Sequence, residues 1–72
     1  MDVGTWLASL GLDQYAALFR EHEIEADVLA ELTDQHLSDL GVPLGHRLRM
    51  LRAIGELVRE RAAAERRTLG TL

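Results

Sequence analysis

The three histidines are the first candidates for chemistry, because a neutral imidazole is a common metal ligand. His22, His36 and His46 lack the short spacings of a preformed zinc site, and the sequence contains no cysteine that could supply a thiolate. His22 is expected to be half-buried on the inner face of a helix, whereas His36 is expected at the surface. His46 is expected to shape the start of a helix. We therefore expect neither a metal site nor a cofactor.

Glu21, His22 and Glu23 form a cluster that could exchange protons, with a carboxylate on each side of an imidazole. No nucleophile accompanies the cluster, because Ser9 and Ser38 fall inside predicted helices and outside any catalytic motif. The sequence also lacks a glycine-rich phosphate-binding loop, and a chain of 72 residues leaves little room for a cleft. The chain is therefore not expected to be an enzyme.

Charge is distributed unevenly along the chain, although the formal net charge is only -4. Residues 1–40 carry nine acids and one arginine, whereas residues 41–72 carry seven arginines and three acids. Such a split can place an acidic and a basic surface on one molecule, or it can be solvated surface in which charges match the helix dipoles. All eight bases are arginine, a bias typical of GC-rich codons, which favours a bacterial source.

Length and composition predict one small globular domain. Hydrophobic residues make up 47% and charged residues 28% of the chain, which is typical of a folded protein. No apolar run approaches the roughly 20 residues that a transmembrane helix needs. The acidic start at Met1-Asp2 is unlike a secretory signal. We expect a cytoplasmic protein without membrane insertion.

Apolar residues recur at helical spacing through the chain, which predicts an all-α fold. Four short helices are expected, over residues 3–10, from about residue 13, and over residues 26–31 and 34–40. Asp2 and Thr33 are typical N-caps for the first and fourth of these helices. Gly11 and Gly41 are typical of the position that follows a helix end.

A long last helix is expected to begin near Leu44, because Val42-Pro43 favours an extended backbone before it. Its inward stripe is predicted to consist of Leu44, Leu48, Leu51, Ile54 and Val58. Gly55 costs roughly 1 kcal/mol inside a helix relative to alanine, which indicates close packing at that position.

The predicted domain covers residues 1–66, with a core over about 3–58 and a helical extension over 59–66. Residues 67–72 are expected to be a frayed tail or the start of a linker. The buried side chains are predicted to be Trp6, Leu7, Leu10, Tyr15, Phe19, Ile24, Leu29, Leu32, Leu37, Leu40, Leu51 and Ile54. The four short helices are each too short to be stable alone, so they must pack on the last one.

Three groups of residues follow one another at fixed spacing. They are Trp6-Leu7-x-x-Leu10-Gly11-Leu12-x-x-Tyr15-x-x-x-Phe19; then Ile24, Leu29 and Leu32-Thr33; then Leu37-x-x-Leu40-Gly41-Val42 and Gly45-His46-Arg47-x-x-Met50-Leu51-x-x-Ile54. Together they resemble a SAM (sterile alpha motif) domain over residues 3–58. The resemblance implies a five-helix bundle in which four short helices pack on a long C-terminal helix. The chain is similar to the N-terminal SAM domains of bacterial multidomain signalling proteins.

The resemblance also implies a function, because SAM domains mostly bind other SAM domains head to tail. A mid-loop surface of one copy then meets an end-helix surface, at the N-terminus of the last helix, of the next, and the contact propagates into rings or filaments. The end-helix surface would comprise Leu44, Gly45, His46, Arg47, Arg49 and Arg52. The mid-loop surface would comprise Glu25, Asp27, Val28, Ala30, Glu31, Asp34 and Asp39. Arginine–carboxylate pairs would orient the copies, around an apolar centre of Leu44, Val28 and Ala30.

Three functions are open from the sequence. The domain could self-associate into an oligomer or polymer, it could be a monomer that binds a different SAM or signalling partner, or its last helix could bind RNA. RNA binding is the least favoured, because the net charge is negative and the aromatic residues Trp6, Tyr15 and Phe19 are expected in the core.

Overall fold

The computed structural model describes the backbone of residues 1–70 and the side chains of residues 1–66. Within that part, the regular elements are all helical: α1 (Val3–Ser9), α2 (Ala16–Glu21), α3 (Asp34–Asp39) and α4 (Leu44–Gly70). Two 3₁₀ turns, η1 (Asp13–Tyr15) and η2 (Leu29–Glu31), precede α2 and α3. The predicted all-α fold with a long C-terminal helix is confirmed.

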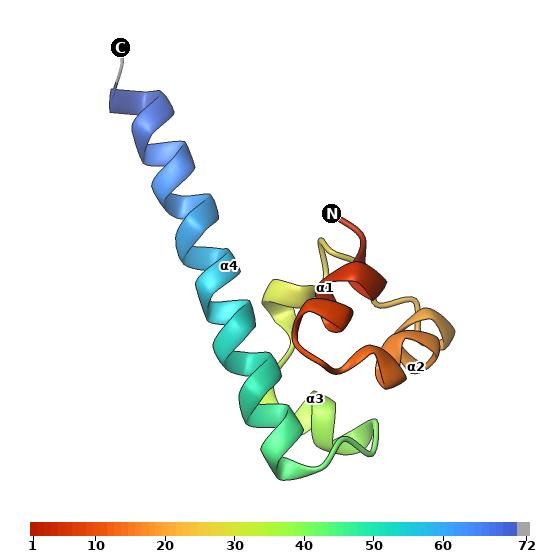
Figure 1. The fold of residues 1–72 in the computed structure, drawn as a ribbon. Coiled ribbons are helices and arrows are strands. Elements are labelled where there is room, and N and C mark those ends of the chain that lie inside the picture. The colour runs from red at the N-terminus through yellow and green to blue at the C-terminus, as the bar shows by residue number, and fades with distance from the viewer. Residues whose placement is uncertain (71–72) are drawn as a thin grey trace.

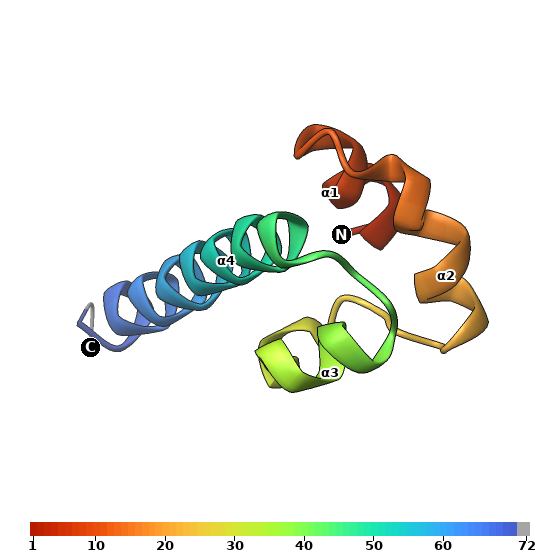
Figure 2. The ribbon, with the colours of Figure 1, turned by 90° about the horizontal axis from the view of Figure 1, so that it is seen from below.

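The first half of α4 is the element on which the short helices assemble. α3 and η2 contact it directly, while α1 packs with η1 and α2 on the other side of the core (Figure 1). Seen from below, α1, α2 and α3 form an arc around the beginning of α4 (Figure 2). The second half of α4 extends past the other elements, which makes the molecule 45 Å long and 20 Å across.

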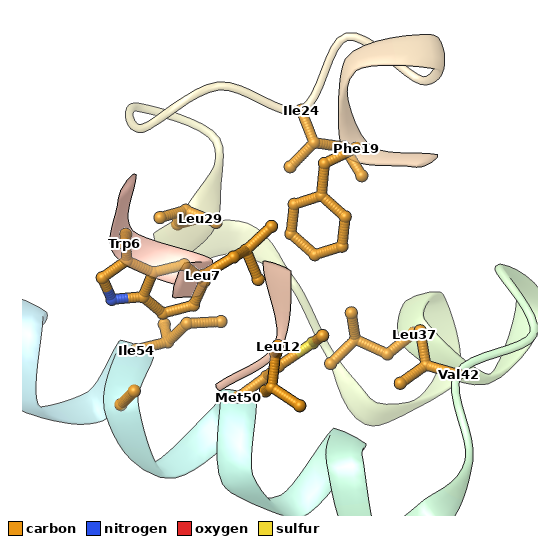
Figure 3. Close-up of a cluster of buried hydrophobic side chains, with 11 residues drawn as sticks. Trp6, Leu7, Leu12, Phe19, Ile24, Leu29, Leu37, Val42, Met50 and Ile54 are labelled. Atoms are coloured by element: carbon orange, nitrogen blue, oxygen red, sulfur yellow. The ribbon is translucent and has the colours of Figure 1, made fainter. Parts of the chain in front are cut away.

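The core lies inside this arc. The buried side chains converge on Met50 and Ile54 of α4 (Figure 3), and they are Trp6, Leu7, Leu12, Phe19, Ile24, Leu29, Leu37, Val42, Met50, Ala53 and Ile54. Seven of the predicted core residues are confirmed among them. Five others are only partly buried against the cluster: Leu10, Tyr15, Leu32, Leu40 and Leu51. Four buried residues were not predicted: Leu12, Val42, Met50 and Ala53.

The predicted N-caps are confirmed. The Asp2 carboxylate accepts from the backbone N–H of Thr5 at 2.9 Å, and this hydrogen bond holds the pKa of Asp2 below its ordinary value. The Thr33 hydroxyl accepts from the backbone N–H of His36, whose Nδ1 accepts from the backbone N–H of Thr33. This reciprocal pair is a capping box that fixes the start of α3.

Helices α1, α2 and α3 end with the same hydrogen-bond pattern. After α1 the N–H of Leu12 donates to the carbonyl of Leu7 at 2.8 Å. The equivalent bonds run from Ile24 to Phe19 after α2 and from Val42 to Leu37 after α3. This is the Schellman motif, in which an apolar residue beyond the helix end packs back onto the helix. All six of these side chains are buried, so the three helix ends supply much of the core.

The Schellman motif needs a left-handed residue just before the apolar one. Gly11 and Gly41 hold that position with φ of 73° and 90°. After α2 the position is held by Glu23, with φ of 55°. A side chain with a Cβ is strained in this conformation, so α2 ends at a conformational cost that α1 and α3 avoid.

The predicted helix over residues 26–31 is wrong in type. The segment forms a turn followed by the 3₁₀ turn η2, with hydrogen bonds from Val28 to the carbonyl of Glu25 and from Leu29 to that of Ala26. No side chain caps it. The backbone turns extended at Leu32, with φ of -70° and ψ of 136°, so the segment ends there and only the tighter i→i+3 bonds form.

The predicted inward stripe of the last helix is wrong in part. Leu44, Leu48 and Val58 are 58%, 53% and 45% exposed, whereas the buried face of α4 is formed by Met50, Ala53 and Ile54. Gly55 was expected at a close contact, but a Cβ built there would meet nothing within 4 Å. The glycine therefore weakens the helix without allowing a close approach inside this chain.

Two further expectations change at the helix ends. His22 is exposed, because α2 ends at Glu21 and His22 follows as its C-cap. α4 continues to Gly70, beyond the predicted end of the helical extension at residue 66. Residues 71–72 lie outside the described residues, and the division into domain and linker stays a prediction. Within residues 1–70, no helix is both long and apolar enough to cross a membrane.

Candidate protein-interaction surfaces

The first turns of α4 divide the predicted end-helix residues into an inner and an outer group. His46 and Arg47 are half-buried, whereas the other four are exposed: Leu44, Gly45, Arg49 and Arg52. Successive residues of an α-helix point about 100° apart, so two turns present residues to both sides. The inner pair and the outer four therefore have different surroundings.

Arg47 is bound by its own chain. Its Nε donates to Oδ1 of Asp34 at 2.9 Å, and its Nη1 donates to the carbonyl oxygen of Val42 at 2.7 Å. Among the side chains that the structure describes, Arg47 and Asp34 form the single ion pair. A base predicted on the end-helix surface and an acid predicted on the mid-loop surface are thus brought together within one copy.

His46 contacts a different part of the domain. Its Nδ1 shares a hydrogen bond with the hydroxyl of Tyr15, the last residue of η1. The tautomer of the imidazole decides which atom donates. The two rings also meet edge to face, with centroids 5.4 Å apart and an interplanar angle of 73°. The contact holds the first turn of α4 against η1, which agrees with the predicted place of His46 at the helix start.

The outer group combines apolar side chains with free bases. Leu44 and Leu48 are four residues apart on α4, so they lie on the same face of the helix, and both are more than half exposed. Arg49 and Arg52 are exposed beside them. The partial positive charge of the helix N-terminus adds to the charge of these arginines. The surface suits a partner with an apolar centre and an acidic rim.

Two acids of the predicted mid-loop surface line a groove. Glu25 and Asp27 are exposed on the turn before η2 and, with Asp2 and Glu23, they surround a hollow of about 670 Å³. Phe19, Ile24, Val3 and Ala16 contribute its apolar lining. Arg20 is the base among the lining residues, so the groove carries an excess of negative charge.

The remaining mid-loop residues are distributed over two other places. Val28 is half-buried against the core, and Ala30 lines a smaller hollow of about 390 Å³ beside α4. Glu31 is exposed at the end of η2, and two acids lie on α3. Of those two, Asp34 is paired with Arg47, and Asp39 accepts a hydrogen bond from Nε2 of Gln35 at 2.9 Å. Among the described side chains, the mid-loop acids with no such partner are therefore Glu25, Asp27 and Glu31.

Leu48 is the interface candidate that the sequence reasoning missed. It was assigned to the buried stripe of α4, yet it is 53% exposed next to Leu44. A signal was present in the sequence, because Met50, Ala53, Ile54 and Leu57 form an equally regular apolar stripe on the other side of the helix. The structure buries the stripe with Met50 and leaves Leu44 and Leu48 exposed.

The described residues show no arrangement for metal chemistry. Among them, no group of three or more His, Asp or Glu side chains is placed to hold a metal ion. Glu21, His22 and Glu23, the cluster considered for proton transfer, are all exposed and follow one another at the end of α2. The candidate residues that remain are those of the two predicted contact surfaces.

Comparison with known proteins places this chain in a family. It matches the family described as SAM domain (Sterile alpha motif) over residues 1–57. Diacylglycerol kinase delta of Mus musculus is 42% identical over 65 residues, which cover 89% of this chain and 5% of the kinase. SH3 and multiple ankyrin repeat domains protein 1 of Mus musculus is 44% identical over 54 residues, covering 74% of this chain and 2% of that protein. Protein bicaudal C of Drosophila melanogaster is 40% identical over 63 residues, covering 86% of this chain and 7% of that protein.

No solved structure gives a significant match. Each of these relatives is far longer than the matched segment, which spans 5%, 2% and 7% of them. They come from animals, so they give no support to the predicted bacterial source. The family match covers well over half of the chain, and the chain therefore belongs to the SAM family, whose members are non-catalytic modules that bind other SAM domains or other proteins.

Proposed function

Starting from this family membership, we propose that the domain associates head to tail with further copies of itself. The outer group at the start of α4 (Leu44, Gly45, Arg49 and Arg52), together with Leu48, is the end-helix surface of one copy. The turn that carries Glu25 and Asp27, with Glu31, is the mid-loop surface of the next. Because the two surfaces differ and both lie on one chain, the contact can repeat into a ring or a filament.

The observation that carries this proposal is the exposure of Leu44 and Leu48 beside two arginines that have no ion pair within the part of the chain that the structure describes. Fully burying a leucine side chain contributes about 1.5–3 kcal/mol, so two half-exposed leucines can supply the centre of a weak interface. Arg49 and Arg52 would then orient an acidic partner and raise the association rate more than they raise the affinity. The groove that holds Glu25 and Asp27 supplies such a partner, with an apolar lining between its acids.

The alternative within the same family is a domain that stays monomeric and binds a different SAM domain or signalling protein through one of these surfaces. In either case the module would bring together the domains of a longer cytoplasmic signalling protein and raise their local concentration. RNA binding is the less favoured alternative, since Trp6 and Phe19 are buried and Tyr15 is engaged by His46, so these aromatic rings are not placed to stack on bases.

Sedimentation velocity over a concentration series tests the proposal. The mean mass should rise above 8.0 kDa with protein concentration and fall when salt is added, because salt screens the charges that orient the copies. A constant 8.0 kDa at every concentration would favour the monomeric alternative.

Surface variants then identify the two sides. R49E/R52E should remove the end-helix surface and Asp27→Arg should remove the mid-loop surface, so that neither variant grows beyond small species. A 1:1 mixture retains one intact surface of each kind and should stop at a heterodimer. Arg66→Glu in the extension of α4 is a control that changes charge away from both surfaces. Unchanged growth of both variants would reject the head-to-tail arrangement.

A further inference from the structure

We propose that His46 and Arg47 are positioning residues, which govern the association by holding the first turn of α4 in place rather than by touching a partner. The inference rests on the proposed head-to-tail function and divides the predicted end-helix residues by role. Arg47 would pair with Asp34 of its own chain in the assembly, as it does in the single domain.

The contacts of Arg47 bridge the two ends of α3. Asp34 is the first residue of α3, and Val42 is the apolar residue of the Schellman motif that follows it. The guanidinium binds the Asp34 carboxylate at 2.9 Å and the Val42 carbonyl at 2.7 Å. A planar fork with several fixed donors is suited to such a double contact, whereas a lysine offers one point charge. Arg47 therefore sets the position of α4 relative to all of α3.

The hydrogen bond of His46 fixes the same turn from another direction. Tyr15 lies between η1 and α2, far from α3 in the sequence, and its hydroxyl contacts the imidazole of His46. Neighbouring residues of one helical turn thus reach two separate segments of the domain. Two contacts in different directions restrict both the tilt and the rotation of the start of α4.

The start of α4 needs such contacts, because little else holds it. Gly45 lowers the helix propensity of the first turn, and a Cβ there would meet nothing within 4 Å. Leu44 and Leu48 face solvent and contribute little to the core. Without the contacts of His46 and Arg47, this turn would fray and the outer side chains would lose a defined direction, at an entropy cost when a partner binds.

The ion pair also removes two charges from the contact between copies. Arg47 is 17% exposed and Asp34 is 55% exposed, and each already has its partner. A neighbouring copy would therefore meet a pair whose charges already compensate each other, with Nε of Arg47 and Oδ1 of Asp34 engaged before association. Arg49 and Arg52 have no such bond among the described residues, so they are the bases free to contact an acidic partner.

Charge exchange between the two positions separates pairing within a chain from pairing between chains. R47D and D34R, each alone, should weaken self-association by at least about threefold, and the double variant D34R/R47D should recover the part of the loss that comes from the ion pair but not the part that comes from the Val42 carbonyl contact. A 1:1 mixture of the two single variants should not recover, because each chain keeps its own broken pair. The double variant should also co-assemble with the natural chain. Every variant is measured at a temperature where circular dichroism shows it to be folded.

The opposite results would overturn the inference. If Arg47 paired with Asp34 of a neighbouring copy, the mixture of single variants would grow as the natural chain does. The double variant would then exclude the natural chain, since arginine would face arginine and aspartate would face aspartate. An absence of growth in the natural chain would instead reject the proposed function itself, so the two failures are distinguishable.

Tyr15→Phe tests the second contact. It removes the hydroxyl that meets His46 and keeps the ring, so it should weaken association by a smaller factor than R47D while the domain stays folded. R66D is the matched control for R47D, since it makes the same charge change in the α4 extension. If Tyr15→Phe left association and the unfolding temperature unchanged, His46 would not be a positioning residue.

Discussion

The two surfaces of this domain differ in how firmly the fold holds them. The end-helix surface lies on the regular first turns of α4, where the side chains of His46 and Arg47 form hydrogen bonds to the rest of the domain. The acidic turn with Glu25 and Asp27 lies between a strained residue, Glu23, and the uncapped 3₁₀ turn η2. The difference indicates that one side of the proposed contact is pre-formed, while the other can adjust to it.

A pre-formed surface concentrates the binding free energy in a few side chains, because little of that energy is spent on ordering. An adjustable surface distributes it over many small contributions. Removing the contact of one side chain should therefore have a large effect on the end-helix surface and a small effect on the acidic turn, where only a reversal of charge is expected to block binding. The predictions below test this comparison, from the largest expected effect to the smallest.

Leu48→Asp should have the largest effect on association. It removes an apolar contact and places a negative charge toward the acidic turn, so the affinity between copies should fall by well over tenfold, equivalent to more than about 1.4 kcal/mol. The domain should unfold at nearly the same temperature, because Leu48 is 53% exposed and is not part of the core. Sedimentation velocity and thermal unfolding measure the two quantities. Ala63→Asp, at an exposed position in the extension of α4, is the control.

Gly41→Ala should destabilise the domain by about 1–2 kcal/mol, because a Cβ is strained at φ of 90°. For a domain of this size, that corresponds to a fall of roughly 4–16 °C in the unfolding temperature. The loss should come from backbone strain alone, since a Cβ at Gly41 meets nothing within 4 Å. An unchanged unfolding temperature would show that the end of α3, and with it the entry to α4, is less fixed than the structure indicates.

Glu23→Gly should stabilise the domain, by less than Gly41→Ala destabilises it. It relieves the strain at φ of 55°, but it also gives the unfolded chain more conformational freedom, so we expect a gain of about 0.5–1 kcal/mol. Urea unfolding measures the change. A loss of stability would mean that the glutamate side chain has a stabilising contact that outweighs the strain.

Asp27→Asn should have the smallest effect. Removing one exposed charge from an adjustable acidic surface should lower the affinity by about two- to fivefold, and the loss should shrink at high salt. Glu65→Gln, in the extension of α4, controls for the change in net charge. A fall as large as that of Leu48→Asp would mean that the acidic turn is as pre-formed as the start of α4.

The features that could be predicted from the sequence are those that depend on a few neighbouring residues. Asp2 and Thr33 were recognised as caps because an N-cap needs only its own side chain and the next three residues. Leu12 and Val42 belong to the same kind of local pattern, a glycine followed by an apolar residue, but the pattern was read as a helix end rather than as a contribution to the core.

The roles of the end-helix residues could not be predicted in the same way. The sequence shows that His46 and Arg47 follow Gly45, but the partners Tyr15 and Asp34 lie 31 and 13 residues away along the chain. Only the packing of α3 and η1 around α4 decides which way each side chain points. Leu48 was misplaced for a related reason, since a helix with two apolar stripes does not itself reveal which stripe meets the core.

The second half of α4 determines in which direction, around the helix axis, the C-terminal end of the helix points. Beyond the body of the domain the helix continues to Gly70, and each residue advances it by 1.5 Å and turns it by about 100°. The orientation of any group joined rigidly to that end, relative to Leu44 and Leu48, would be set by the helix. One inserted residue would swing such a group about 100° around the helix axis, and seven would return it nearly to its first orientation, about 10 Å farther out.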